Sequence, residues 1–231
     1  MNYAVILASG QGKRLNSSTP KQFLLVNNHP LIFYTISAFE KCPDIDEIII
    51  VSKKKYFPII YQIIDKYGFN KVHMLVQGGK TRQLSSYNAL VSLKNFALKK
   101  DVVVIHDAAR PLISSEQISL IINETIKHNA VILVSNVTNT IVDFHNHKYQ
   151  GILNRHDLLN AETPQSFTYG LILKAHENAK IQGINNATDD AQLVNNINKK
   201  IYVIKNQSNN LKVTTSSDIE ILQFLLNKEV S

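Results

Sequence analysis

The first half of the chain alternates short apolar runs with longer amphipathic stretches. The apolar runs predict four buried strands, at residues 3–7, 47–51, 72–76 and 102–106. The amphipathic stretches predict three helices between them, at residues 31–40, 56–67 and 82–98. This alternation is typical of a Rossmann-like α/β fold, in which helices cover both faces of a mostly parallel sheet. Ligands of such sheets bind beyond the carboxyl ends of the strands.

The second half opens with one more amphipathic helix. We expect it after Pro111, because Ile118 and Ile121 fall on the same helical face. Ser114 and Gln117 have the spacing of a capping box, which predicts where this helix begins.

One later stretch breaks the alternation. Residues 140–143 and 149–152 are strand-like and flank residues 144–148, which predicts a protruding β-ribbon. A two-stranded ribbon is only marginally stable by itself in water. We therefore expect this arm, at residues 138–153, to pack on another surface, and a second subunit is one candidate.

Length and composition bound the kind of protein. The chain has 231 residues, 44% of them hydrophobic, and no Pro-, Gly- or Ser-rich linker divides it, so we predict a single domain over residues 1–231. No apolar run is long enough to span a membrane and no signal-peptide pattern precedes the first strand, which predicts a cytoplasmic protein with no membrane partner. Cys42 is the only cysteine, which excludes disulfides within the chain and cysteine-based zinc sites.

The chain is basic, with a formal net charge of +7. Such a charge can indicate nucleic-acid binding. The lysine clusters at residues 53–55, 99–100 and 199–200, however, lie at the ends of expected elements, where solvated charge is ordinary. We therefore expect no nucleic-acid partner, and assign part of the excess charge to an anionic ligand.

A loop of small residues follows the first expected strand. Gly10 and Gly12 allow a positive φ and a close approach of the backbone to a ligand. Backbone N–H groups in such a loop can hold an anion. The cations Lys13, Arg14 and Lys21 follow at once and can offset more than one phosphate, so the loop predicts a nucleoside triphosphate site.

Two better-known glycine loops do not fit this sequence. A dinucleotide fingerprint requires a third glycine where Leu15 stands, which weakens the alternative of a nicotinamide-dependent oxidoreductase. A P-loop requires a glycine where Leu7 stands and a hydroxyl where Arg14 stands.

Polar residues also follow the fourth expected strand. Asp107 can coordinate Mg²⁺ alongside substrate phosphates, or simply cap the next turn. Arg110 can clamp a phosphate, or form an ion pair with Asp107. We interpret His106 as a packed histidine at the strand end rather than as a catalyst.

A second glycine turn follows the third expected strand. Gly78 and Gly79 precede a helix that carries Arg82 and Ser85, so hydrogen-bond donors again gather at the carboxyl edge of the sheet, although the turn can also be a simple connection. Later in the chain, the residues at 188–190 are interpreted as a helix N-cap followed by acidic residues.

Taken together, these motifs resemble the cytidylyltransferases that make CDP-activated polyols. The matching segments cover nearly the whole chain, at residues 8–14, 20–22, 78–85, 106–111, 155, 163–165, 188–191 and 210–214. Two branches of this family are similar to the chain: one acts on methylerythritol phosphate in isoprenoid precursor synthesis, the other on ribitol 5-phosphate to supply CDP-ribitol for cell-surface polymers. Leu7 stands where the methylerythritol branch usually has proline, and residues 139–142 lack the usual Asp and Lys of that branch, with Val142 resembling the ribitol branch. The motifs at 106–111 and 188–191 are more similar to the methylerythritol branch, which we prefer.

The resemblance implies a role for each matching residue. The catalytic residues would be Arg14, Lys21 and Lys212. The nucleotide would be bound by Ala8, Ser9, Gly10, Gly12, Gly79, Arg82, Ser85, Asp107 and Ala108. The polyol phosphate would be bound by Asp107, Arg110, Thr140, Arg155, Thr163 and Lys212. Asp107 would hold Mg²⁺ or another divalent cation, and the arm would form a homodimer in which Arg155 serves the partner's site.

The implied reaction is chemically sensible without a general base. A phosphate monoester has a second pKa near 6, so at neutral pH it is already a nucleophilic dianion. It would attack the α-phosphorus of CTP in line and expel pyrophosphate. The protein must then supply position and positive charge, which the lysines and arginines of these motifs provide.

Overall fold

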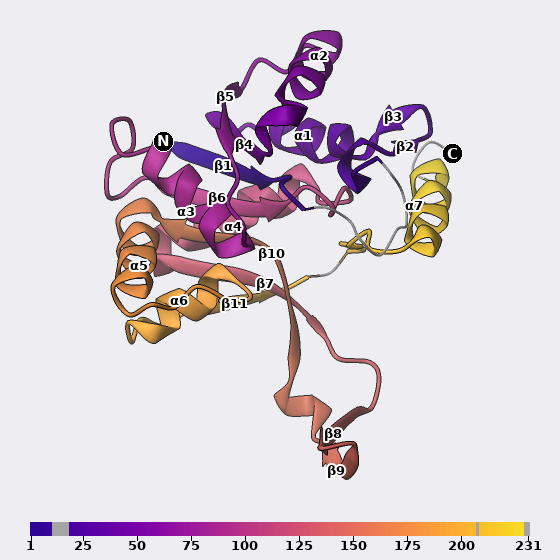
Figure 1. Ribbon diagram of the computed structural model, residues 1–231, viewed down its shortest axis with the longest axis vertical. Coiled ribbons are helices and arrows are strands. Elements are labelled where there is room, and N and C mark those ends of the chain that lie inside the picture. The colour runs from indigo at the N-terminus through magenta and orange to yellow at the C-terminus, as the bar shows by residue number, and fades with distance from the viewer. Residues whose placement is uncertain (11–18, 207, 229–231) are drawn as a thin grey trace.

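A seven-stranded sheet forms the centre of the computed structural model, which describes residues 1–10, 19–206 and 208–228 (Figure 1). Its strand order is β11-β7-β10-β6-β1-β4-β5. The strands are β1 (Asn2–Leu7), β4 (Glu47–Ser52), β5 (Val72–Gln77), β6 (Val102–Asp107), β7 (Ala130–Asn136), β10 (Leu159–Thr168) and β11 (Tyr202–Lys205). Strand β10 runs antiparallel to β6 and β7, and the other pairs in this sheet are parallel. The predicted mostly parallel sheet and its first four strands are confirmed.

The centre of the sheet is buried on both faces. In β1, Tyr3 and Val5 point to one hydrophobic cluster, whereas Ala4 and Ile6 point to another. The register pairs Val5 with Ile49 of β4 on one side, and with β6 on the other. Alternation of this kind buries apolar side chains on both sides of the strand, which explains the uninterrupted apolar run in the sequence.

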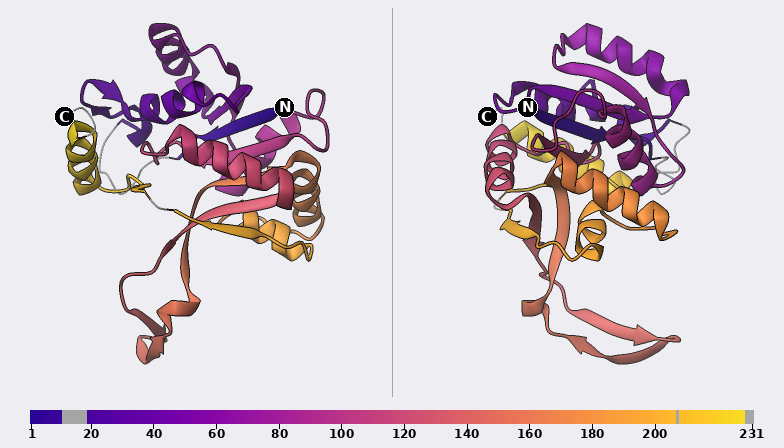
Figure 2. Two further views of the ribbon diagram at one scale, coloured as in Figure 1. Left: turned by 180° about the vertical axis from the view of Figure 1, so that it is seen from behind. Right: turned by 90° about the vertical axis from the view of Figure 1, so that its left-hand side faces the viewer.

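Helices cover both faces, as the alternating pattern predicts (Figure 2). The longer helices are α1 (Leu31–Lys41), α2 (Phe57–Tyr67), α3 (Arg82–Ser92), α4 (Ser115–His128), α5 (Tyr169–Ile181), α6 (Asp190–Asn196) and α7 (Ser216–Lys228). Helices α1, α2 and α4 contribute Ile36, Ile60 and Ile121 to one cluster. Helices α3 and α5 contribute Leu90 and Ile172 to the cluster on the opposite face.

Helix α7 closes a third, smaller cluster at the end of the chain. Its Leu222 packs with Val26 and Val213 beside the short strands β2 (Leu25–Val26) and β3 (His29–Pro30). Among the described residues, no helix has both the length and the apolar character needed to cross a bilayer. The cytoplasmic location stays a prediction.

Two helix ends refine the predictions. At the start of α4, the hydroxyl of Ser114 accepts a hydrogen bond from the backbone N–H of Gln117 at 3.3 Å, as in a capping box, but the Gln117 side chain donates to Asn206 instead of completing the box. Helix α3 ends at Ser92 rather than at the predicted residue 98. Residues 93–96 form turns instead, in which the N–H of Lys94 donates to the carbonyl of Val91 at 3.1 Å and the N–H of Phe96 donates to the carbonyl of Leu93 at 3.0 Å.

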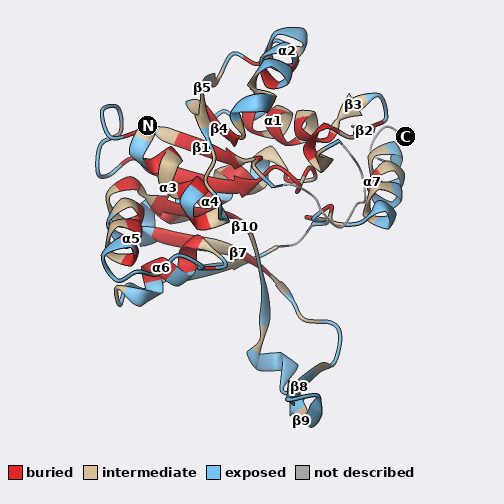
Figure 3. Ribbon diagram, in the orientation of Figure 1, coloured by how far each residue is buried: buried red, intermediate tan, exposed pale blue. Residues whose placement is uncertain are grey.

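The predicted ribbon is present and projects from the body of the molecule (Figure 1). Strands β8 (Ile141–His145) and β9 (Lys148–Leu153) are longer than predicted and meet at a turn of two residues, Asn146 and His147, with φ values of 50° and 60°. Both φ values are positive, as in the two-residue hairpin turns whose twist matches that of a β-ribbon. Figure 3 shows that most of the arm is exposed, and Phe144 at its tip is 69% exposed.

Candidate active site

A large cleft of about 1020 Å³ lies at the carboxyl ends of β1, β4, β5 and β6. This is the edge at which parallel α/β sheets bind ligands. Its lining is Leu7, Ala8, Ser9, Gly10, Lys21, Gln22, Lys53, Gln77, Gly78, Gly79, Lys80, Thr81, Arg82, Leu84, Ser85, Asn88, Asp107, Ala108, Ala109 and Lys212. The three strand-end motifs that the sequence singles out therefore share one cleft with Lys21 and Lys212.

The opening loop is anchored to the neighbouring strand β4. The N–H of Ala8 donates to the carbonyl of Val51 at 2.7 Å, and the Ser9 hydroxyl donates to the same carbonyl at 3.2 Å. The side-chain amide of Gln22, from the short 3-10 helix η2 (Lys21–Phe23), donates to the carbonyl of Ala8 at 2.7 Å. These bonds fix the first residues of the loop at the floor of the cleft.

Gly10 differs from the expectation. It does not adopt a positive φ, and a Cβ placed on it would meet nothing within 4 Å. The fold itself therefore does not require glycine here, and the remaining reason for a small residue is the close approach of a ligand. Gly12, Lys13 and Arg14 lie outside the described residues.

The second glycine turn is tightly packed. A Cβ on Gly78 would lie 2.7 Å from Cβ of Ser9, and one on Gly79 would lie 2.5 Å from Cβ of Leu84, so neither position tolerates a side chain without movement. The Ser85 hydroxyl accepts a hydrogen bond from the N–H of Gly79 at 3.1 Å. The turn thus brings backbone groups to the cleft wall beside the opening loop.

Asp107, the last residue of β6, is the only carboxylate among the described lining residues. Its Oδ2 accepts a hydrogen bond from Nζ of Lys212 at 2.6 Å, and its Oδ1 lies 3.4 Å from Nε of Arg82. Burial alone would raise the pKa of the carboxyl, but the charges of Arg82 and Lys212 outweigh it and hold that pKa well below its usual range. Asp107 is therefore ionised at any physiological pH.

Positive charge dominates the cleft. Within the part of the chain that the structure describes, its lining includes five cationic side chains, those of Lys21, Lys53, Lys80, Arg82 and Lys212, and one carboxylate. A concave site with this excess attracts a polyanion. The sequence did not identify Lys53 and Lys80 as site residues, and Lys53 was interpreted as an ordinary surface lysine. The signal for Lys53 was its position directly after β4, at the ligand-binding edge of the sheet.

Lys21 and Lys212 are held close together by the backbone. The Nζ of Lys21 donates to the carbonyl of Val213 at 2.8 Å, and the N–H of Val213 donates to the carbonyl of Ala109 at 2.8 Å. The segment with Lys212 is thereby tied to the segment that follows β6. Residues 192 positions apart in the sequence are in direct contact at this point.

Arg110 and Thr163 lie beside the cleft rather than in its lining. Arg110 donates from Nη1 to the carbonyl of Asn210 at 2.6 Å, and the same nitrogen lies 4.0 Å from the carboxylate of Glu162. The ion pair with Asp107 that the sequence left open is thus replaced by one with Glu162. The Thr163 hydroxyl accepts a hydrogen bond from the N–H of Asp107 at 3.1 Å, so it holds the strand end in place.

Thr140 and Arg155 are exposed and do not line this cleft. Both belong to the arm region, where Nη1 of Arg155, in the 3-10 helix η4 (Arg155–Asp157), donates to the carbonyl of Thr138 at 3.2 Å. Within one chain, the structure does not bring these two residues to the other predicted site residues. Their assignment requires a neighbouring subunit.

His106 has the structural role that the sequence suggests. Its Nε2 lies 3.0 Å from the carbonyl of Arg110, and the ring packs against Phe39. Burial lowers the pKa of His106 to about 4, so the ring is neutral at physiological pH and donates this hydrogen bond from Nε2. It does not line the cleft.

The cleft fits a divalent cation only in combination with a substrate. Among the described residues, no group of three or more His, Cys, Asp or Glu side chains could hold a metal ion. Mg²⁺, however, is commonly bound by one or two carboxylates together with substrate phosphates. Asp107, ionised and open to the cleft, is a suitable ligand of that kind.

A buried network behind Arg82 was not foreseen. The N-cap of α6 is Asp189 rather than Thr188, one residue later than the pattern indicates, with Oδ1 accepting from the N–H of Gln192 at 2.9 Å. Asp190, interpreted as an acid favoured by the helix dipole, is fully buried, with Oδ2 at 2.6 Å from Nη1 of Arg82 and Oδ1 at 2.9 Å from Nε2 of His176. Nothing in the local sequence distinguishes Asp190 from Asp189, because its partners come from distant helices.

This fold and this cationic cleft define a Rossmann-like α/β protein of the nucleotide-binding class. Residues 2–228 match the 2-C-methyl-D-erythritol 4-phosphate cytidylyltransferase family. A protein of that name from Clostridium botulinum is 38% identical over 229 residues, covering 98% of each chain, and one from Lachnoclostridium phytofermentans is 34% identical, covering 96% of this chain and 95% of the relative. The crystal structure of 4-diphosphocytidyl-2C-methyl-D-erythritol synthase from Anaerococcus prevotii has a TM-score of 0.83 at 29% identity, covering 98% of both chains. The chain belongs to the 2-C-methyl-D-erythritol 4-phosphate cytidylyltransferase family.

Proposed function

We propose that the protein transfers a cytidylyl group from CTP to 2-C-methyl-D-erythritol 4-phosphate and releases pyrophosphate, a step of isoprenoid precursor synthesis. The family supports the methylerythritol branch over the ribitol branch that Leu7 and Val142 kept open. The observation that carries the proposal is the cleft itself, whose described lining residues include five cations and one carboxylate at the carboxyl edge of the sheet.

The reaction joins two anions, so charge is the main obstacle. The polyol phosphate, already a dianion, attacks the α-phosphorus; a new P–O bond forms as the bond to the β-phosphate oxygen breaks, and pyrophosphate leaves. Lys21 and Lys212 face the cleft, and their ammonium groups offset the charge that accumulates on the phosphates. We add Arg14 to these cations because of its place in the glycine-loop motif at residues 8–14.

Asp107 orients the positive charges that lie beside the reacting phosphates. Its Oδ2 accepts a hydrogen bond from the Lys212 ammonium at 2.6 Å. In the complex, Asp107 would hold the divalent cation, whose contribution is additional positive charge on the phosphates. The ionised state of Asp107 suits this role.

The two glycine turns form the nucleotide side of the site. Ala8, Ser9, Gly10 and Gly12 carry the triphosphate, since small residues let the backbone N–H groups approach it. The cytosine and ribose lie against a wall of the cleft to which Gly79, Arg82, Ser85 and Ala108 contribute. Ser85 is already fixed by its hydrogen bonds to Gly79 and Thr81, so the wall is formed before CTP binds.

The polyol phosphate requires a second subunit in this scheme. Arg110 and Thr163 approach from the same chain, whereas Thr140 and Arg155 lie on the exposed arm. Apolar side chains on the arm, including Phe144, Tyr149 and Ile152, are exposed in one chain and would be covered in a homodimer. A dimer through the arm therefore both stabilises the ribbon and brings Arg155 to the partner's cleft.

A pyrophosphate-release assay tests the substrate assignment. The purified protein is incubated with CTP and Mg²⁺, and with 2-C-methyl-D-erythritol 4-phosphate, ribitol 5-phosphate or glycerol 3-phosphate in parallel. We expect turnover with the methylerythritol substrate. Turnover only with ribitol 5-phosphate would contradict the proposed acceptor, and no turnover with any of the three would contradict the reaction.

A further inference from the structure

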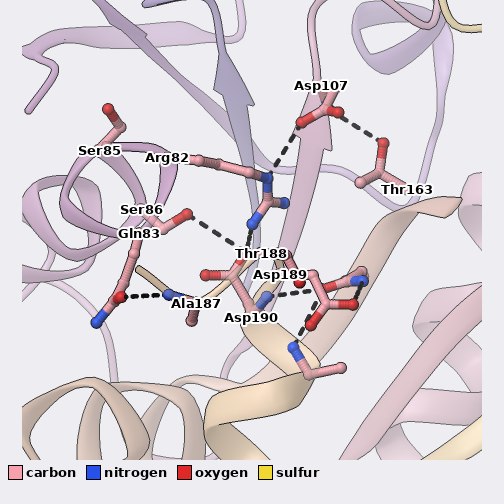
Figure 4. Close-up of polar contacts among 12 residues, drawn as sticks. Arg82, Gln83, Ser85, Ser86, Asp107, Thr163, Ala187, Thr188, Asp189 and Asp190 are labelled. Atoms are coloured by element: carbon pink, nitrogen blue, oxygen red, sulfur yellow. Dashed lines mark hydrogen bonds and ion pairs between the residues drawn. The ribbon is translucent and has the colours of Figure 1, made fainter. Parts of the chain in front are cut away.

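Arg82 lies between two carboxylates that differ in their surroundings (Figure 4). Nη1 is 2.6 Å from Oδ2 of Asp190, which is completely buried. Nε is 3.4 Å from Oδ1 of Asp107, which faces the cleft. The shorter and better shielded contact is therefore the one away from the cleft, so Asp190 is the fixed partner and Asp107 the exchangeable one.

Asp190 is itself held from three elements. His176 of α5 donates from Nε2 to Oδ1 at 2.9 Å, and Ser86 of α3 donates to Oδ2 at 3.3 Å. The side-chain oxygen of Gln165, in β10, accepts the N–H of Asp190 at 3.1 Å. A carboxylate with this many partners cannot move without breaking several buried hydrogen bonds.

The proposed reaction does not use this network directly, but the network constrains the orientation of the groups that take part in the reaction. When CTP and a divalent cation occupy the cleft, the Lys212 ammonium would turn to the phosphates and Asp107 would bind the cation. Arg82, held by Asp190, would then be the protein cation that keeps the Asp107 carboxylate in its orientation. An arginine without a second, fixed carboxylate would instead follow Asp107 or bind the phosphates itself.

We propose that Asp190 is a positioning residue for this reaction, acting through Arg82 on Asp107, with His176 as its support. The inference rests on the proposed cytidylyltransferase function. Asp190 touches neither substrate nor the reacting atoms; it fixes the guanidinium so that Asp107 keeps one orientation throughout the reaction.

The test is a double-mutant cycle with Asp190→Asn and Arg82→Gln, with Asp189→Asn as the matched control. Asp189 lies next to Asp190 on the same helix and has no contact with Arg82, so we expect wild-type kinetics for Asp189→Asn. For Asp190→Asn we expect kcat to fall about tenfold to a hundredfold, as for other partners that orient a reacting group, while the KM for CTP changes less than about threefold. In the Arg82→Gln background, Asp190→Asn should have no further effect, because the residue through which it acts is absent.

A crystal structure of the Asp190→Asn variant gives a readout that does not depend on activity. We expect the Arg82 guanidinium to turn from residue 190 and pair with both oxygens of Asp107. If Asp190→Asn does not fold, His176→Gln replaces it in the same cycle, because it loosens Asp190 and leaves its charge in place.

The outcomes separate the two proposals. Asp190→Asn kinetics equal to those of Asp189→Asn, additive losses in the cycle, or an unmoved Arg82 and Asp107 in the crystal would each overturn the positioning role. A wild-type protein without cytidylyltransferase activity would overturn the proposed function, and the crystal structure would still decide whether Asp190 positions Arg82.

Discussion

Replacing Lys212 with alanine removes the cation closest to the carboxylate of the cleft. The Nζ of Lys212 lies 2.6 Å from Oδ2 of Asp107. The backbone next to it is fixed independently, because the N–H of Val213 donates to the carbonyl of Ala109 and its carbonyl accepts from Lys21. The substitution therefore removes one ammonium group and leaves its surroundings in place.

The expected effects on catalysis and on stability differ widely. An electrostatic donor aimed at charge that develops in a transition state is worth about a hundredfold to a thousandfold in kcat, or roughly 3–4 kcal/mol. The ground-state ion pair with Asp107 is worth less, because the Lys212 side chain is 41% exposed and solvent screens it. We expect the free energy of unfolding to change by less than about 1 kcal/mol.

The assay compares pyrophosphate release at saturating CTP with urea unfolding for the same preparations. Lys205→Ala is the matched control, since Lys205 is exposed on β11 and lies outside the cleft lining. It removes the same charge from the protein and should leave kcat unchanged. A kcat for Lys212→Ala within about fivefold of the wild type would refute the role assigned to this ammonium group.

Three further predictions follow from the structure. Gly78→Ala places a Cβ 2.7 Å from Cβ of Ser9, so we expect a KM for CTP raised by about tenfold, against little change for the exposed Gly183→Asn control, when both are measured by initial rates. Burial lowers the pKa of His106 to about 4, below the value near 6.5 of an unfolded chain, so the contribution of the neutral ring to stability is complete above pH 6.5 and is lost as the pH falls toward 4. Urea unfolding at several pH values should show this loss, and the free energy of unfolding of the His106→Gln variant should depend less steeply on pH. Phe144→Glu, at the exposed arm, should convert a dimer to monomers in analytical ultracentrifugation and lower activity, whereas Phe224→Glu on α7, 59% exposed, should do neither; a wild type that sediments as a monomer would contradict the dimer proposal.

The sequence predicts the architecture well because its signals are local. The apolar runs that become β1, β4 and β6 are buried on both faces, and such runs are recognisable without knowing their neighbours. The strand-end rule then places the glycine turns and Asp107 at one edge, and the structure joins them in one cleft. The end of α3 is less predictable, because the apolar pattern continues past Ser92 into turns, where the N–H groups of Lys94 and Phe96 bond to carbonyls three residues earlier.

The contacts that organise the cleft are the part that local patterns do not contain. Arg82 pairs with Asp190 across 108 positions, and Lys212 pairs with Asp107 across 105. Asp189 and Asp190 are adjacent and chemically identical, yet one caps a helix and the other is buried under Arg82. Only the packing of α3, α5 and α6 on the same face decides between these roles.

A crystal structure with bound CTP decides whether this cleft is the nucleotide site. We expect the triphosphate in the cleft, within hydrogen-bond distance of Nζ of both Lys21 and Lys212, with the cytosine against the turn at Gly79 and Ser85. CTP bound at another surface, or a cleft that stays empty at a CTP concentration that supports full turnover, would contradict it.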